Sequence, residues 1–503
     1  MLPFGFDNTY ARELPGFYLR CTPASAPAPR LLFLNETLAA ELQLDVAALR
    51  SADGAALFAG NALPADAEPI AQVYAGHQFG GFSPQLGDGR ALLLGELVDR
   101  AGRRRDVAFK GSGRTPFSRG GDGKAAVGPM LREVLIGEAM HALGIPTTRA
   151  LAVAATGEQV RREATLPGAV LTRVAASHLR VGTFQFFAAQ GQIDKLRQLA
   201  DYTIARHDPA LSDQPERYLA LLRAVAQRQA TLIAQWLNVG FIHGVMNTDN
   251  MAISGETIDY GPCAFMEAFD PAAVFSSIDH GGRYAYGNQP HIAQWNLARF
   301  AETLLPLMAD ADDEPAVQRA VEQATGVIDG FPGMCAAALL GGQRAKLGIF
   351  EAAAADDAAD AALAHDWFAL LHAQSVDFTL AWRRLADAAE GGDGALRALF
   401  AQPQTLEPWL ARWRERCAID DAASRPDAGQ RATRMRRANP WIIPRNHLVE
   451  EALAAATNDD NLAPFEQLLD ALRRPFDEAP ELARYAEPAS AEVTAGYQTF
   501  CGT

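Results

Sequence analysis

The segment His243-Gly244-Val245-Met246-Asn247-Thr248-Asp249-Asn250, followed nine residues later by Asp259-Tyr260-Gly261, decides which fold we expect for this chain. Asn250 and Asp259 each carry a side-chain oxygen, and their spacing predicts two ligands for a divalent cation that bridges nucleotide phosphates. Asp249 is the carboxylate nearest to them in sequence. A chance occurrence of these residues is the alternative for the segment taken alone.

The same segment is similar to the catalytic loop of protein kinases, H-R-D-L-x-x-x-N, and to the D-F-G that follows it. His243 and Asn250 match, and Asp259-Tyr260-Gly261 stands in place of D-F-G. Val245 occupies the position of the kinase catalytic base. The pattern therefore predicts kinase-like phosphate and metal binding without the usual base.

Upstream residues predict two further parts of a nucleotide site. Val107-Ala108-Phe109-Lys110 indicates a strand that ends in a lysine, similar to the V-A-I-K strand of kinases. Glu133 follows on a helix predicted over 129–143, which has Pro129 in its first turn and stops at Gly144. Glu133 can pair with Lys110, although a surface lysine and an ordinary helix glutamate are the alternative for these two residues alone.

Glycine-rich segments flank this lysine. Gly87-Asp88-Gly89-Arg90 lets backbone amides approach a phosphate, but a hairpin turn accounts for these residues equally well. Gly111-Ser112-Gly113-Arg114 and Gly120-Gly121-Asp122-Gly123-Lys124 predict a loop that closes over phosphates, with a ligand-free mobile loop as the alternative.

The rest of the pattern predicts an α+β chain, sheet-rich first and helical later. Strands are expected at 91–98, 106–110, 151–154 and 169–174, a long helix near 216–237, and a strand-turn-strand at 251–258. We expect a protein-kinase-like two-lobed fold with N-terminal and C-terminal helical extensions. The predicted divisions are an N-terminal extension (1–60), an N-lobe (61–180), a C-lobe (181–350) and a C-terminal helical extension with a redox-type cysteine tail (351–503).

Composition favours a globular acidic protein with one basic region. Hydrophobic residues make up 49% of the 503 residues, and 60 Asp and Glu against 45 Lys and Arg give a formal charge of −15. This charge disfavours general nucleic-acid binding. Between 100 and 162, however, twelve basic residues outnumber five acidic ones, which favours a local anion site over a solvated basic surface.

The sequence predicts neither export nor a membrane span. Residues 1–14 lack the basic start and apolar run of a signal peptide, and no stretch approaches 18 uncharged apolar residues. The five cysteines are scattered and form no C-x-x-C pair, which is typical of a reducing compartment. We expect a cytoplasmic protein that binds neither nucleic acid nor membranes.

Four longer blocks carry a resemblance to a known family. They are Tyr74-Ala75-Gly76-His77-Gln78-Phe79-Gly80, Lys110 to Arg119, His243 to Asn250, and Asn439-Pro440-Trp441-Ile442-Ile443-Pro444-Arg445-Asn446-His447. With these blocks the chain resembles the selenoprotein O family over essentially its whole length. The resemblance implies an enzyme that transfers AMP from ATP to Ser, Thr or Tyr hydroxyls of proteins, itself included, with Mg²⁺ or Mn²⁺. It also implies that ATP binds flipped relative to its orientation in kinases.

The resemblance implies roles for individual residues. The proton acceptor falls on Asp249, the metal ligands fall on Asn250 and Asp259, and the glutamate that pairs with the lysine falls on Glu133. The nucleotide ligands fall on Gly87, Gly89, Arg90, Lys110, Asp122, Gly123, Arg173, Arg180 and Asp259.

The residues leave two other functions open. A phosphotransferase could use the same ligands with Asp249 as its base, and a non-catalytic scaffold could bind nucleotide, although intact metal ligands argue against the scaffold. Some family members carry selenocysteine at the C-terminal redox position, where this chain has Cys501. The segment Phe275-Ser276-Ser277-Ile278 near the expected site contains no cysteine partner, so the sequence does not imply redox control.

Overall fold

The large antiparallel sheet of this protein is built from strands in the first 175 residues. In the computed structural model, which describes residues 4–350, 356–424 and 428–500, its strand order is β1-β3-β6-β7-β10-β9-β2, with β8 paired to β10. The strands are β1 Tyr18–Arg20, β2 Arg30–Leu34, β3 Ile70–Gln72, β6 Ala91–Val98, β7 Arg104–Lys110, β8 Ala125–Ala126, β9 Arg149–Arg161 and β10 Thr165–Ala175. Each expected strand of this region lies within one of them.

Two small sheets stand apart from the large one. β4 (Gly76–Gln78) pairs with β5 (Gly81–Ser83) as a tight hairpin, and β11 (Phe241–Ile242) pairs with β12 (Ala264–Phe265). The second pair brackets the segment from His243 to Gly261, so both ends of that segment are held by backbone pairing.

The helix that carries Glu133 packs across the large sheet. This helix, α5, runs from Val127 to Ala142, close to its predicted bounds, and Gly144 follows it with a positive φ of 76°. It contacts β9 and β10, and it also contacts α16 (Asn446–Asn458) and α17 (Ala463–Leu472) from the C-terminal part of the chain. Nearly all its side chains are buried because packed elements cover more than one of its faces.

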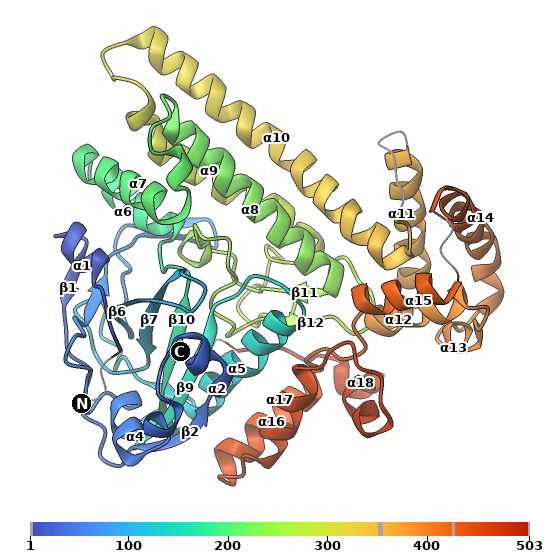
Figure 1. Ribbon diagram of the computed structural model, residues 1–503, viewed down its shortest axis with the longest axis horizontal. Helices are drawn as coiled ribbons and strands as arrows, with labels where there is room; N and C mark the ends of the chain where they lie inside the picture. Colours follow the sequence, from blue (N-terminus) through green and yellow to red (C-terminus); the bar gives the residue numbers. More distant parts are fainter. Residues whose placement is uncertain (1–3, 351–355, 425–427, 501–503) are drawn as a thin grey trace.

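The second half of the chain is helical. α8 (Arg217–Val239), α9 (Gln289–Met308) and α10 (Glu314–Leu347) pack together, with α10 lying along the other two at the top of Figure 1. The remaining helices are α1 Thr9–Glu13, α2 Glu36–Glu41, α3 Val46–Leu49, α4 Ala52–Phe58, α6 Val181–Ala189, α7 Ile193–His207, α11 Asp357–Ala373, α12 Phe378–Ala389, α13 Gly394–Arg397, α14 Glu407–Ser424, α15 Ala428–Ala438, α18 Ala483–Ala486 and α19 Ala491–Thr494.

The strand-turn-strand expected at 251–258 does not form. The segment is a turn closed by Gly255, whose N–H donates to Ala252 O, and it makes single bridges to Arg180 and Thr147. The prediction was wrong because these residues pair with distant loops and not with each other.

One helix bears on the expectation that the chain has no membrane span. By length and composition, α10 is long and apolar enough to cross a membrane, because a run of small and apolar residues fills its middle. A single helix of this kind is weak support for a span, since long core helices have the same composition. One side of α10 packs on α8 and α9.

The C-terminal part has its own buried aromatic cluster. Trp367, Trp382, Trp409 and Trp413 are almost completely buried, and Trp367 lies 4.5 Å from Trp409 between ring centres. These rings join α11, α12 and α14, the group of helices at the right of Figure 1.

Candidate active site

One cavity of about 630 Å³ lies between the large sheet and the His243–Asn250 segment, a volume within the range of small-molecule sites. All the predicted nucleotide and metal ligands and the predicted proton acceptor line it. They are Gly87, Gly89, Arg90, Lys110, Asp122, Gly123, Arg173, Arg180, Asp249, Asn250 and Asp259. Glu133 is the exception among the predicted site residues, because it lies behind Lys110.

Lys110 is held by two carboxylates. It ends β7, and its Nζ lies 2.5 Å from Glu133 Oε1 and also contacts Asp259. Glu133 Oε1 further accepts the Tyr260 N–H at 3.2 Å, which ties α5 to the segment after Asp259. Burial raises the pKa of Asp259, but the charges of Lys110 and Arg90 outweigh it and hold that pKa far below its ordinary value.

The loop around Asn250 is fixed by its own histidine. His243 Nδ1 accepts the Val245 N–H at 3.3 Å, so its Nε2 carries the proton and donates to Ile258 O at 2.9 Å. This bond connects the loop to the residue before Asp259. Asn250 Nδ2 donates to Val245 O at 3.1 Å, which leaves the amide oxygen of Asn250 available as a ligand.

Asp249 is a buried carboxylate of the cavity, as is Asp88, which lies 3.8 Å from Arg180. Asp249 Oδ2 accepts from Gln78 Nε2 at 3.1 Å, whereas Asp249 Oδ1 is buried without a hydrogen-bond partner. Burial raises the pKa of Asp249 to about 6, against the opposing charge of Arg180. Gly76 passes so close that a Cβ there would lie 2.5 Å from Asp249 Oδ1, so only glycine fits beside this carboxylate.

The glycine turns bring backbone close to the cavity. Gly87 has a φ of 70°, and a Cβ on it would meet the Phe117 ring at 2.4 Å. Gly123 also has a positive φ, and the neighbouring Asp122 pairs with Arg162 at 2.9 Å. Arg90 Nη1 is buried without a hydrogen-bond partner, as expected of a cation that awaits an anionic group.

Arg173 and Arg180 are oriented by His178. Arg173 Nε donates to His178 Nε2 at 3.3 Å, so the ring proton is on Nδ1, which donates to Asp106 Oδ2 at 3.1 Å. Arg180 Nε lies 3.4 Å from His178 O, and its Nη1 donates to Asp249 O at 3.1 Å. Burial lowers the pKa of His178, which agrees with a neutral ring.

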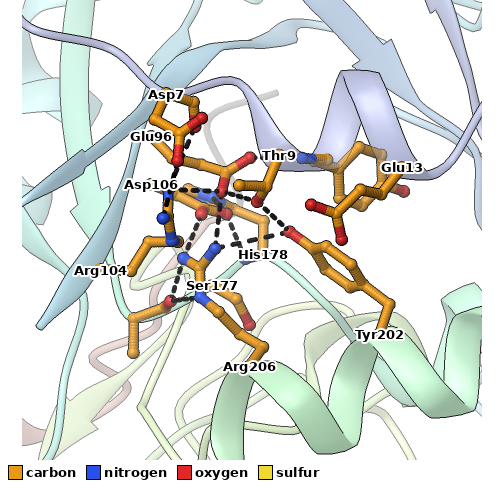
Figure 2. Close-up of polar contacts among 12 residues, drawn as sticks. Asp7, Thr9, Glu13, Glu96, Arg104, Asp106, Ser177, His178, Tyr202 and Arg206 are labelled. Atoms are coloured by element: carbon orange, nitrogen blue, oxygen red, sulfur yellow. Dashed lines mark hydrogen bonds and ion pairs between the residues drawn. The ribbon is translucent and has the colours of Figure 1, made fainter.

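A buried polar network supports His178 from behind. Figure 2 shows Asp106 between His178 and Arg206, whose Nη2 donates to Asp106 Oδ1 at 2.6 Å. Arg206 Nη1 also donates to Glu96 Oε2 at 2.8 Å, and Glu96 accepts the Tyr10 N–H at 2.6 Å. Arg173 and Arg180 are therefore anchored through His178 to strands β6 and β7 and to helices α1 and α7.

Several cavity residues had no role in the sequence analysis. Tyr74 lies under Arg180, 4.5 Å from its guanidinium carbon, and Gln78 contacts Asp249; both belong to the block 74–80 that carried the family resemblance. Arg162 belongs to the basic region, and Ile278 ends the segment 275–278, which was considered only for its lack of a cysteine.

The donor set fits a hard divalent cation. Among the described residues, no group of three His, Cys, Asp or Glu side chains could hold a metal by itself. The oxygens of Asn250 and Asp259, with Asp249 Oδ1 unpartnered nearby, suit Mg²⁺ or Mn²⁺, because such ions use one or two protein oxygens together with substrate phosphates.

The C-terminal tail lies against the segment that lacks a cysteine. Thr499 N–H donates to Phe275 O at 2.7 Å, and Ser277 N–H donates to Thr499 O at 3.0 Å. Cys501 lies outside the described residues. Cys263, the cysteine nearest the Asp259 segment, is buried and donates to Tyr260 O at 3.2 Å.

Comparisons with known proteins identify the family of the chain. A family model described as protein adenylyltransferase SelO matches residues 1–473. The protein nucleotidyltransferase YdiU of Chromobacterium violaceum is 61% identical over 490 residues, 97% of this chain and all of that protein. The YdiU proteins of Cereibacter sphaeroides and Rhizobium rhizogenes are 60% and 56% identical over 503 residues, which is all of this chain and 100% and 97% of theirs.

A cavity lined by a paired lysine, several arginines and a buried carboxylate suits a nucleotide-dependent transferase, and the comparisons place the chain among the protein nucleotidyltransferases. The chain belongs to the SelO family.

Proposed function

We propose that this enzyme transfers AMP from ATP to Ser, Thr or Tyr hydroxyls of proteins and releases pyrophosphate. The observation that carries the proposal is that the cavity contains several cationic side chains together with the carboxylate of Asp249. Arg90, Lys110, Arg173 and Arg180 supply positive charge for a triphosphate, while Asp249 is a buried carboxylate that keeps one oxygen without a hydrogen-bond partner. Such an arrangement suits a reaction in which a polyphosphate leaves and a hydroxyl loses its proton.

In this reaction the acceptor oxygen forms a bond to the α-phosphorus, and the bond from that phosphorus to the bridging oxygen of the β-phosphate breaks. Asp249 Oδ1 accepts the hydroxyl proton. Arg173 and Arg180 stabilise the negative charge that grows on the departing pyrophosphate, and Lys110 orients the phosphates through its bond to Glu133. A Mg²⁺ or Mn²⁺ ion held by Asn250 and Asp259 would neutralise further phosphate charge when bound.

The proposal includes the orientation of ATP and the organisation of the chain. Arg173 and Arg180 hold the γ end of a flipped ATP deep in the cavity, so that the α-phosphate faces Asp249. The fold is protein-kinase-like, with an N-lobe over 61–180, a C-lobe over 181–350, and extensions over 1–60 and 351–503. The enzyme acts in the cytoplasm, which agrees with the free thiols of Cys21, Cys263, Cys335 and Cys417.

The proposal is tested by comparing ATP that is labelled at the α-phosphate with ATP that is labelled at the γ-phosphate. The full-length protein, incubated with Mg²⁺ or Mn²⁺ and ATP, should label protein from α-labelled ATP and scarcely from γ-labelled ATP, and its intact mass should rise by one AMP group if it modifies itself. Arg173→Ala or Arg180→Ala should lower transfer by about 10²–10³-fold, the typical effect of a lost donor in a closed site. Folded Asp259→Ala should be inactive. Strong γ-labelling would indicate a kinase, and no labelling would indicate a scaffold.

A further inference from the structure

Three exposed apolar side chains gather around the hairpin and the cavity mouth near Asp249. Phe79, Phe82 and Ile278 are 39%, 42% and 47% exposed, and they are three of nine well-exposed large hydrophobic residues in the part of the chain that the structure describes. Phe79 and Ile278 line the same cavity as Asp249, and Phe82 lies opposite His77 in the β4–β5 hairpin. Exposed apolar groups that cluster in this way mark a binding surface.

The β4–β5 hairpin holds Phe79 in a strained conformation. Phe79 has a φ of 51°, which is unfavourable for a bulky side chain. Its N–H is fixed by Asn247 Oδ1 at 3.2 Å and by the Tyr284 hydroxyl at 3.1 Å. The adjacent residue Gln78 donates to Asp249. The catalytic loop itself therefore holds an exposed aromatic ring at the cavity mouth, and strain of this kind persists where the surroundings enforce it.

Arg283 adds an unpaired positive charge beside the same hairpin. Its guanidinium carbon lies 4.9 Å from the centre of the Trp295 ring and would be 3.7 Å from a Cβ at the hairpin tip, Gly80. Among the described residues no carboxylate lies within 4.0 Å of it. Arg299 also lies over Trp295, but it is paired with Glu302 at 2.5 Å.

We propose that Phe79, Phe82, Ile278 and Arg283 form the acceptor-docking surface of the enzyme. It binds a segment of the protein substrate that carries a large apolar side chain and an acidic side chain next to the hydroxyl that is modified. The hydroxyl must reach Asp249 past Phe79 and Ile278, so the flanking residues contact this surface, where the acidic one pairs with Arg283. This inference rests on the proposed function, because it assumes that a protein hydroxyl is the acceptor.

Peptides that differ in one flanking charge test the surface. Three synthetic peptides of equal length contain one serine flanked by Phe and Asp, by Phe and Lys, or by two Ala residues, and each is incubated with the full-length protein, Mg²⁺ and α-labelled ATP. The wild type should label the Phe–Asp peptide with the highest kcat/KM. Arg283→Glu should shift preference to the Phe–Lys peptide by about fivefold, the upper range for an exposed ion pair. Phe79→Ala should weaken labelling of both Phe peptides, and Phe82→Ala, at a residue that does not line the cavity, should do so without changing the KM for ATP.

Arg299→Glu is the matched control, because it reverses a charge over the same ring and should leave the peptide preference unchanged. If Arg283→Glu does not fold, Arg283→Gln should abolish the preference without reversing it. Equal use of the peptides by the wild type, or an unchanged preference in Arg283→Glu and Arg283→Gln, contradicts the docking surface while α-labelling of protein still supports the proposed function. A dimer that Phe79→Ala and Phe82→Ala dissociate, with peptide preference unaltered, would assign the surface to a second copy of the chain. No α-label in any protein or peptide contradicts the proposed function, and this inference with it.

Discussion

The ion pair between Lys110 and Glu133 predicts that the effects of replacing these two residues on AMP transfer are not additive. Lys110→Ala and Glu133→Ala should each lower AMP transfer by about 10²-fold or more, because the first removes a phosphate ligand and the second lets that ligand move. The double variant should be little worse than either single one, since the two residues act as one unit. kcat/KM for α-labelled ATP measures this, with Lys195→Ala, which lies outside the cavity, as the control. If the double variant loses as much kcat/KM as the product of the two single losses, Lys110 and Glu133 act independently.

Lys346 predicts a pH dependence of stability. It is almost completely buried against the Trp382 and Phe378 rings, and burial lowers its pKa from 10.5 to about 7. The folded state therefore binds fewer protons than the unfolded state between pH 7 and 10.5, and the penalty of burying the charge is largest below pH 7. Lys346→Met should stabilise the protein more at pH 6 than at pH 9, by roughly 2–3 kcal/mol. Urea unfolding of both proteins at the two pH values measures the difference, and an equal gain at both would contradict the lowered pKa.

At the residue scale, sequence motifs predicted some of the site residues, and the family resemblance added others such as Arg173 and Arg180. Lys110, Asn250 and Asp259 stand at recognisable spacings, and the structure places all three on one cavity. Gln78 and His178 were not assigned roles, because the role of each depends on contacts across the fold: Gln78 meets Asp249 through a hairpin folded over the loop, and His178 meets Asp106 on a separate strand.

At the scale of elements, His178 is a positioning residue that connects strand β7 to the arginines of the cavity. His178→Asn can keep the bond to Asp106 but not the one to Arg173, whereas His178→Gln can reach Arg173 but not Asp106. If orientation of Arg173 matters, His178→Gln should retain more AMP transfer than His178→Asn, although His178→Asn should be the more stable protein. Kinetics and thermal unfolding of both variants test this, and activity that simply follows stability would reduce His178 to a structural role.

The prediction of elements succeeded where neighbours in sequence are also neighbours in space. β6 forms with the predicted bounds and pairs with β7, the next strand along the chain. β1 and β2 were not predicted, since they are only three and five residues long and pair with β3 and β9. Short strands with distant partners have too few residues to show a pattern.

At the scale of the whole molecule, Arg445 joins the C-terminal part to the rest. Its guanidinium is fully buried, contacts Glu267, pairs with Asp377 at 2.6 Å, and donates to Ala486 O at 3.0 Å. Arg445→Met should destabilise the protein by about 3–5 kcal/mol, because it leaves two acidic groups without their cation. Arg484→Ala, which removes an exposed pair with Glu451, should change stability by about 0–1 kcal/mol. Denaturant unfolding compares the two, and similar small losses would contradict the role of Arg445.

Two ion pairs between α5 and the C-terminal helices limit how this chain can be shortened. Arg132 on α5 pairs with Glu450 on α16 at 3.1 Å, and Glu138 pairs with Arg473, at the end of α17, at 3.1 Å. A fragment that ended before α16 would keep every side chain that lines the cavity, yet the helix that presents Glu133 would lose its outer support. The C-terminal helices thus support α5 from outside the cavity, and any shortened or fused form of this enzyme needs residues 446–473 to keep that support.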